Sequence, residues 1–322
     1  MIANSGEYRK KNGQRGYVMM NNFIFENKTK VYFGKGGVKE YLGGLLANFG
    51  ETVMLAYGGG SIKCNGVYDE IMGILNAQGK CVVEFSGIMS NPTYAKVQEG
   101  AKLARENHVD LILAVGGGSV SDCCKVISGA FDTLSHAMET YFGKPDENNL
   151  SDDINEAVMR SVIRSIRILL TDPENYDARS ELARASAMAE NGVLKIGKVT
   201  DFQAHQIQHQ LGAYTDCNHG AGLAVIHPVL YRHIYKSGTA RFTRWAQNVW
   251  GIAPKGSDGE TAAGIDALAA FIKEIGLPTS FAELGIPADT DFRAIADSTN
   301  VTAGCCKKLT HDEIYEILQE CL

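Results

Sequence analysis

The stretch VMLAYGGGS (residues 53–61) recurs almost unchanged as LILAVGGGS (residues 111–119). In each copy a short apolar run leads into three glycines, a serine and a helical pattern, which predicts a buried strand, a tight turn and a helix. Such a turn places backbone N–H groups at a helix N-terminus, where a phosphate can bind. Either copy alone is explained by a structural turn. Two copies at the carboxyl ends of predicted parallel strands indicate a ligand crevice at that edge of the sheet.

The same alternation of apolar runs and helical patterns extends from residue 23 to about residue 115. It is typical of βαβ units in a parallel sheet. The strands are expected at 30–33, 53–57, 81–85 and 111–115. Val115 ends the last expected strand.

Beyond Ser151 the apolar residues recur every three or four positions, which predicts helices throughout. The first helix, 154–170, is expected to be capped by Ser151, Asp152 and Asp153 and stopped before Pro173, because a proline forces its predecessor out of the helical region. Further helices are expected at 178–191, 221–235, 241–250, 261–275 and 311–321. The sequence therefore predicts an α/β lobe followed by an all-helical lobe.

Composition is typical of a protein with two lobes, free in the cytoplasm. The chain has 322 residues and a net charge of −6, which argues against nucleic acid or an anionic membrane as partner. No apolar run is long enough to cross a bilayer. The eight cysteines are scattered or vicinal, as in a reduced protein. Residues 1–20 lack the apolar segment of a signal peptide and are expected to form a disordered extension.

Two helical segments carry residues that suit a metal ion. Asp132 and His136 are four residues apart, as are His205 and His209, so each pair projects from one helix face. His219 follows just before an expected helix. A single histidine on a helix is usually a core or surface residue, but the two pairs and the third histidine together predict a metal site. One carboxylate and three imidazoles, from Asp132, His136, His205 and His219, suit Fe²⁺ or Zn²⁺.

At this point the chain resembles the iron-containing (group III) alcohol dehydrogenases, and within them the butanol dehydrogenase branch. The motifs that carry the resemblance are FGKGGV, YGGGSIKCNGVYDEI, LAVGGGSVSD, GAFDTLSHAMETYF and HQIQHQLGAYTDCNHGAGLAVIHP. The resemblance implies a dehydroquinate synthase-like fold, a nucleotide-binding domain at 21–128 and a metal-binding helical domain at 129–322. It implies that Asp132, His136, His205 and His219 bind the metal, and that catalytic His209 lies beside substrate and nicotinamide. Alternatively, His209 only orients its neighbours.

The two glycine turns are the expected cofactor site. The resemblance also places Asp122 and Lys125 near the nicotinamide and its ribose, although both also suit an exposed first helical turn. The first turn carries Lys63 with no acid nearby in the sequence, which predicts a preference for NADP(H) over NAD(H). The cofactor-binding residues are expected to be Gly58, Gly59, Gly60, Ser61, Lys63, Gly116, Gly117, Gly118, Ser119, Asp122 and Lys125.

The chain departs from the family pattern after Ser128. The family continues there with more of its nucleotide-binding lobe, whereas here Ser128 joins directly to the segment that carries Asp132. The missing material corresponds to roughly two supersecondary units, about 60 residues. The sheet should have fewer strands than in relatives, and the helix after the second glycine turn should run almost directly into the metal-bearing helix.

Two functions fit these observations. The first is a metal-dependent oxidoreductase, a homodimer that interconverts small primary alcohols and aldehydes with NAD(P)(H), impaired by the deletion. The second is a non-catalytic descendant that keeps the metal and the helical lobe. A glycerol-dehydrogenase-like or dehydroquinate-synthase-like enzyme is disfavoured by the Asp-His-His-His set and the GGGSIKCNG turn.

Overall fold

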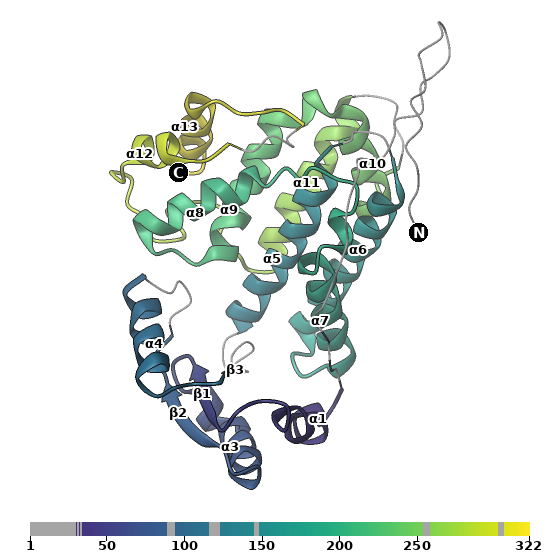
Figure 1. Ribbon diagram of the computed structural model, residues 1–322. Helices are drawn as coiled ribbons and strands as arrows, with labels where there is room; N and C mark the ends of the chain where they lie inside the picture. Colours follow the sequence, from purple (N-terminus) through teal and green to yellow (C-terminus); the bar gives the residue numbers. More distant parts are fainter. Residues whose placement is uncertain are drawn as a thin grey trace, which may run out of the picture.

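The computed structural model describes residues 30, 32, 34–88, 94–115, 123–144, 148–253, 258–301 and 306–322. Its first part is a small α/β unit at the lower end of the view in Figure 1. The elements follow one another as α1 (Gly37–Leu46), β1 (Thr52–Tyr57), α2 (Ser61–Cys64), α3 (Val67–Ala77), β2 (Cys81–Phe85), α4 (Tyr94–Glu106) and β3 (Leu111–Val115).

The three strands form a parallel sheet in the order β2-β1-β3. Val53 of β1 pairs with Val82 of β2 and with Leu111 of β3, so all three strands end at the same edge. The predicted strands 53–57, 81–85 and 111–115 are thus confirmed. Of the predicted strand 30–33, only Lys30 and Tyr32 are described, and neither lies in a strand.

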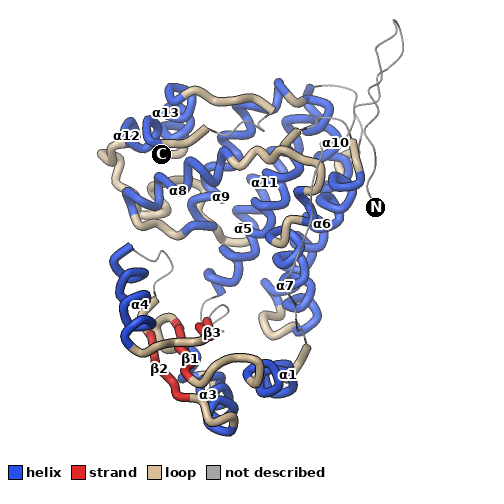
Figure 2. The backbone as a smooth tube through the Cα atoms, viewed as in Figure 1, coloured by secondary structure: helices blue, strands red, loops and turns tan. Residues whose placement is uncertain are grey.

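Both faces of the central strand β1 are covered. Its odd residues Val53, Leu55 and Tyr57 pack with α1 and α3, whereas Met54 and Ala56 pack with Phe85 and with α4. Successive side chains of a strand point to opposite faces, and helices on both faces explain why β1 is apolar throughout. Figure 2 shows the small sheet beneath a much larger helical part.

The second part of the chain is helical. It contains α5 (Cys123–Tyr141), α6 (Leu150–Thr171), α7 (Tyr176–Glu190), α8 (Gln203–Thr215), α9 (His219–Ile234), α10 (Thr239–Trp250), α11 (Asp258–Glu274), α12 (Phe292–Ser298) and α13 (His311–Glu320). One apolar core unites these helices, and it shares no buried residue with the two cores beside the sheet. Stacked and edge-on aromatic rings, including Phe142, Phe242 and Trp245, fill its centre.

Two local details differ from the sequence-based expectations. The α6 helix starts earlier than predicted, because Asn149 is its cap and forms a reciprocal capping box with Asp152. Ser151 instead donates its hydroxyl to the carbonyl of Ile196. The short helix α12 was not predicted, since seven residues give too few turns for a periodic pattern.

The α5 helix runs unbroken from Cys123 to Tyr141, across the predicted junction at Ser128 and Gly129. The direct connection expected from the deletion is therefore one continuous helix, which enters the helical core from the side of the sheet (Figure 1). In the described ranges no helix is both long and apolar enough to cross a membrane.

Candidate metal centre

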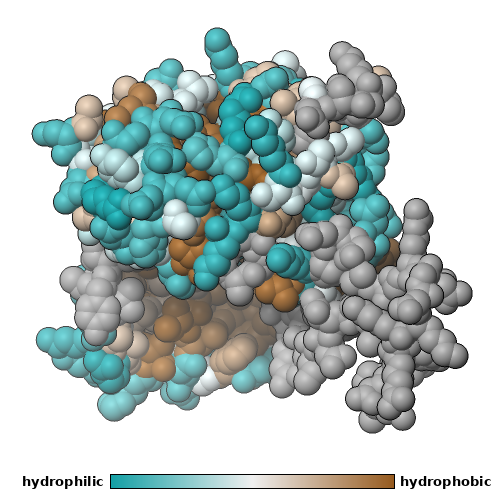
Figure 3. Space-filling model, turned by 90° about the horizontal axis from the view of Figure 1, so that it is seen from above, coloured by the Kyte–Doolittle hydropathy of each residue, from teal (hydrophilic) through white to brown (hydrophobic). Residues whose placement is uncertain are grey.

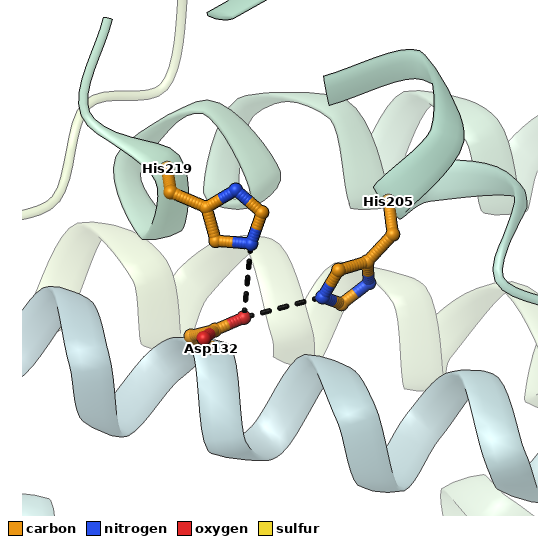
Figure 4. Close-up of side chains that lie close together, drawn as sticks. All are labelled: Asp132, His205 and His219. Carbon is orange, nitrogen blue, oxygen red and sulfur yellow. Dashed lines mark hydrogen bonds and ion pairs between the residues drawn. The ribbon is translucent and has the colours of Figure 1, made fainter. Parts of the chain in front are cut away.

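Three helices bring the candidate ligands together. Asp132 and His136 lie on one face of α5, His205 lies near the start of α8, and His219 is the first residue of α9. Asn218 fixes that start, because its side chain accepts a hydrogen bond from the backbone N–H of Ala221. Figure 4 shows Asp132 pointing from α5 toward both His205 and His219.

Donor atoms of Asp132, His205 and His219 all lie within 4.8 Å of one another, which a single metal ion requires, whereas of these three His136 approaches only Asp132 and His205. Asp132 Oδ1 lies 3.3 Å from His205 Nε2, 3.4 Å from His219 Nε2 and 3.7 Å from His136 Nε2. His205 Nε2 and His136 Nε2 are 3.0 Å apart. Bonds of about 2.0–2.1 Å around a tetrahedral ion put neighbouring ligand atoms roughly 3.3 Å apart. The nitrogen-rich donor set also suits Fe²⁺.

The charge distribution of the site favours a cation. Burial would raise the pKa of Asp132, but hydrogen bonds with His205 and His219 outweigh it and hold the pKa below its usual range. Burial would lower the pKa of His205, yet the carboxylates of Glu139 and Asp132 raise it to about 9. A carboxylate that stays ionised beside three imidazoles is suited to bind a cation.

Glu139 is a candidate functional residue that the sequence-based interpretation missed. It is fully buried, and its Oε1 accepts a hydrogen bond from the backbone N–H of Ala204 at 2.6 Å. Its other oxygen faces Nδ1 of His205 in a short hydrogen bond. A carboxylate on Nδ1 leaves Nε2 of that ring for the metal and fixes its orientation. The signal was present in the sequence, because Glu139 follows Asp132 by seven residues, two turns along the same face of α5.

A second buried polar group, His227, lies close to the candidate ligands. His227 of α9 is fully buried, and its Nε2 lies 2.6 Å from the hydroxyl of Ser135, the neighbour of His136. Burial lowers the pKa of His227 to about 4, so its ring is neutral at physiological pH. This pair joins α9 to α5 without adding a charge. The sequence offered no spacing signal for it, since the two residues are far apart in the chain.

His209 lies on the open side of the cluster. Its ring stacks on that of His219 with 5.5 Å between centroids, and it is more exposed than His205. Burial and the neighbouring histidines lower its pKa, so the neutral ring is favoured. Its position and charge suit a group that exchanges a proton with a molecule bound at the metal.

The first glycine turn connects β1 to α2. Gly60 has a φ of 101°, a conformation that only glycine adopts without strain, and Lys63 follows one turn later. Although no acid is near Lys63 in the sequence, Glu84 near the end of β2 lies 3.3 Å from its Nζ in space. Parallel strands bring together residues that are distant in sequence. Gly116, Gly117, Gly118, Ser119 and Asp122 lie outside the described residues, and Lys125 is described only as part of the α5 backbone.

Two models of known protein families match this chain and together cover most of it. A model of the Fe-containing alcohol dehydrogenase family, C-terminal part, matches residues 126–322, and a model of iron-containing alcohol dehydrogenases matches residues 28–158. The chain belongs to the iron-containing alcohol dehydrogenase family. Family membership implies an oxidoreductase that uses a metal ion and a nicotinamide cofactor.

Individual relatives of the chain are alcohol dehydrogenases or aldehyde reductases. The chain is 31% identical to a probable NADH-dependent butanol dehydrogenase of Bacillus subtilis, over 94% of this chain and 100% of the relative. It is 26% identical to an NADPH-dependent aldehyde reductase of Escherichia coli, over 83% and 90% of the two chains. Its fold matches the crystal structure of NADH-dependent butanol dehydrogenase A from Thermotoga maritima with a TM-score of 0.86 and 27% identity, covering 94% and 99% of the chains. The predicted family and fold class are thus confirmed.

The alignment with the Bacillus protein spans 392 residues, whereas this chain has 322. The relative therefore contains residues without a counterpart here, which agrees with an internal deletion.

Proposed function

We propose that this protein interconverts small primary alcohols and aldehydes with a nicotinamide dinucleotide and one divalent metal ion. The observation that carries the proposal is that donor atoms of Asp132, His205 and His219 lie within 4.8 Å of one another, while His136 Nε2 lies 3.0 Å from His205 Nε2. These four residues would hold the metal, which in this role acts as a Lewis acid on the substrate oxygen. In this proposal the α/β domain, 21–128, binds the dinucleotide, and the helical domain, 129–322, binds the metal.

The protein's own groups would then orient the substrate and move its proton. Glu139 fixes the ring of His205 through Nδ1, so that Nε2 faces the ligand cluster. His209 has the lowered pKa of a neutral ring and lies beside His219 on the exposed side. It is the group that would accept the alcohol proton or return it to the reduced product.

The dinucleotide is assigned to the glycine turns at the carboxyl edge of the sheet, where open α/β sheets bind such ligands. The described part of this site consists of Gly58, Gly59, Gly60, Ser61 and Lys63. We infer a preference for NADP(H), because the ammonium group of Lys63 can attract a 2′-phosphate. The preference should be narrow, because Glu84 lies beside that ammonium group. Tighter binding of NADH than of NADPH in a calorimetric titration would overturn it.

The first test concerns the metal. Protein prepared with Fe²⁺ or Zn²⁺ should contain about one ion per chain by elemental analysis, and chelation should lower its thermal stability. Replacing Asp132 or His219 by Ala should sharply reduce occupancy. The matched control is His233→Ala, a histidine of α9 that contacts Glu320 instead of the cluster. Full occupancy in the ligand variants would refute the assignment.

The second function, a metal-binding descendant without catalysis, is favoured by one observation, the residues of the Bacillus relative that have no counterpart here. We place that deletion in the lobe that would bind the cofactor. Consumption of reduced cofactor with butanal separates the two. A metal-loaded chain that binds NADPH and reduces butanal supports the enzyme. A metal-loaded chain that binds neither cofactor supports the descendant.

A further inference from the structure

Three side chains surround the carboxylate of Glu84 at the edge of the sheet, and together the four residues form a cluster. The hydroxyl of Tyr57 donates to Oε2 and that of Tyr68 donates to Oε1, each at 2.5 Å. Lys63 donates to Oε2 at 3.3 Å. These residues come from β1, α3, α2 and β2, so the fold as a whole builds the cluster.

The rings of the two tyrosines also contact the ammonium group of Lys63. The Nζ of Lys63 lies 4.5 Å from the ring centre of Tyr68 and 5.3 Å from that of Tyr57. The two rings meet edge to face at 6.1 Å. Hydrogen bonds from the tyrosines, and from Lys63, lower the pKa of Glu84, so the carboxylate stays ionised. The pair nevertheless remains accessible, since 40% of the Glu84 side chain and 48% of the Lys63 side chain are exposed.

The position of this cluster relative to the first glycine turn points to a role in cofactor binding. Glu84 stands near the carboxyl end of β2, in register with Leu55 of β1, the strand that runs into Gly58. In Rossmann folds, an acid about 20 residues after the G-x-G-x-x-G turn accepts a hydrogen bond from the adenosine ribose of NAD(H). Glu84 follows Gly60 at a similar spacing and lies on the strand next to β1.

We propose that Glu84 controls the choice between the two nicotinamide dinucleotides by neutralising Lys63 and opposing a 2′-phosphate. The proposal rests on the proposed function, because it needs a dinucleotide at the first glycine turn. Lys63 and Glu84 then act on the bound dinucleotide in opposite directions. Lys63 attracts the phosphate of NADP(H), and Glu84 both compensates that charge and accepts a hydrogen bond from the free hydroxyl of NAD(H).

The test is Glu84→Gln, with binding of NADH and NADPH measured separately by calorimetry on the metal-loaded full chain. The amide keeps the size of the side chain and removes its charge. The ratio of the NADH to the NADPH dissociation constant should rise about tenfold, because NADPH binds more tightly and NADH less tightly. Adding Lys63→Gln to this variant should remove the gain for NADPH and leave NADH unaffected.

Glu51→Gln is the matched control, with the same change of charge at the opposite, amino-terminal end of β1. It should leave the ratio unchanged. If both cofactors bind and Glu84→Gln behaves like Glu51→Gln, the role of Glu84 is refuted while the proposed function stands. If the wild-type chain binds neither cofactor, both the proposed function and the role of Glu84 fail. Circular dichroism of each variant shows whether the fold is kept. Tyr68→Phe, which removes one donor but keeps the charge of Glu84, is a second variant that should not raise the ratio.

Discussion

At the scale of the residue, the candidate metal centre includes a supporting side chain that is not itself a candidate ligand. Glu139 receives the backbone N–H of Ala204 and Nδ1 of His205, and it does so without contact with solvent. Glu139→Gln keeps the volume but offers one carbonyl oxygen where two carboxylate oxygens now accept. We expect the metal dissociation constant to rise about 10- to 100-fold, the range seen when such outer partners are changed.

The measurement is a competition titration with a chromophoric chelator, carried out well below the unfolding temperature. Glu190→Gln is the matched control, because Glu190 Oε1 lies 3.0 Å from Nδ1 of His136 but is half exposed. Solvent screens that contact, so its removal should cost less. Equal metal affinity in Glu139→Gln and in the wild-type protein would contradict the role given to Glu139.

At the scale of the element, the packing of α5 against the segment before α8 sets the distance between ligands. A Cβ on Gly143, just beyond α5, would lie 2.5 Å from the carbonyl oxygen of Val199. The backbones of residues 144 and 199 are joined there by reciprocal hydrogen bonds of 2.8 Å. Gly143→Ala must therefore push the two segments apart, and we expect it to lower the free energy of unfolding by about 1–3 kcal/mol and to weaken metal binding.

Gly129→Ala is the control on the same helix. Among the described residues, no atom outside the neighbouring backbone of the same helix lies within 4 Å of a Cβ built there. Alanine is also the better helix former, so this variant should gain about 0.5–1 kcal/mol. Chemical denaturation monitored by circular dichroism measures both variants. A stable Gly143→Ala protein with unchanged metal affinity would show that this contact does not position α8.

At the scale of the whole molecule, the shortened sheet governs the expected behaviour. Within the described residues, β3 pairs only with β1, and Ile112 of β3 is 60% exposed. An unpaired edge with an apolar side chain favours pairing with another chain. Viewed from above, the surface is mostly hydrophilic but encloses an apolar recess (Figure 3). We therefore expect concentration-dependent dimers or larger species in light scattering.

The shortened sheet should also weaken turnover, to below about 1 s⁻¹. A lobe without its missing units should hold the dinucleotide loosely, and hydride transfer tolerates little displacement of the reacting atoms. Ile112→Lys should reduce association without changing the metal content, whereas Tyr176→Lys, at another exposed apolar residue, should leave it unchanged. A monomer with ordinary dehydrogenase rates would show that the deletion is harmless.

The sequence by itself determined the local features: three of the strands, most of the helices, the family, and the shared helix face of Asp132 and His136. Each of these depends on residues close together in the chain, where periodicity and spacing fix the geometry. Only the tertiary structure decided that Glu139 supports His205, that Ser135 meets His227, and that Glu84 lies beside Lys63. These contacts join elements whose separation in space depends on how helices and strands pack, which no local pattern encodes.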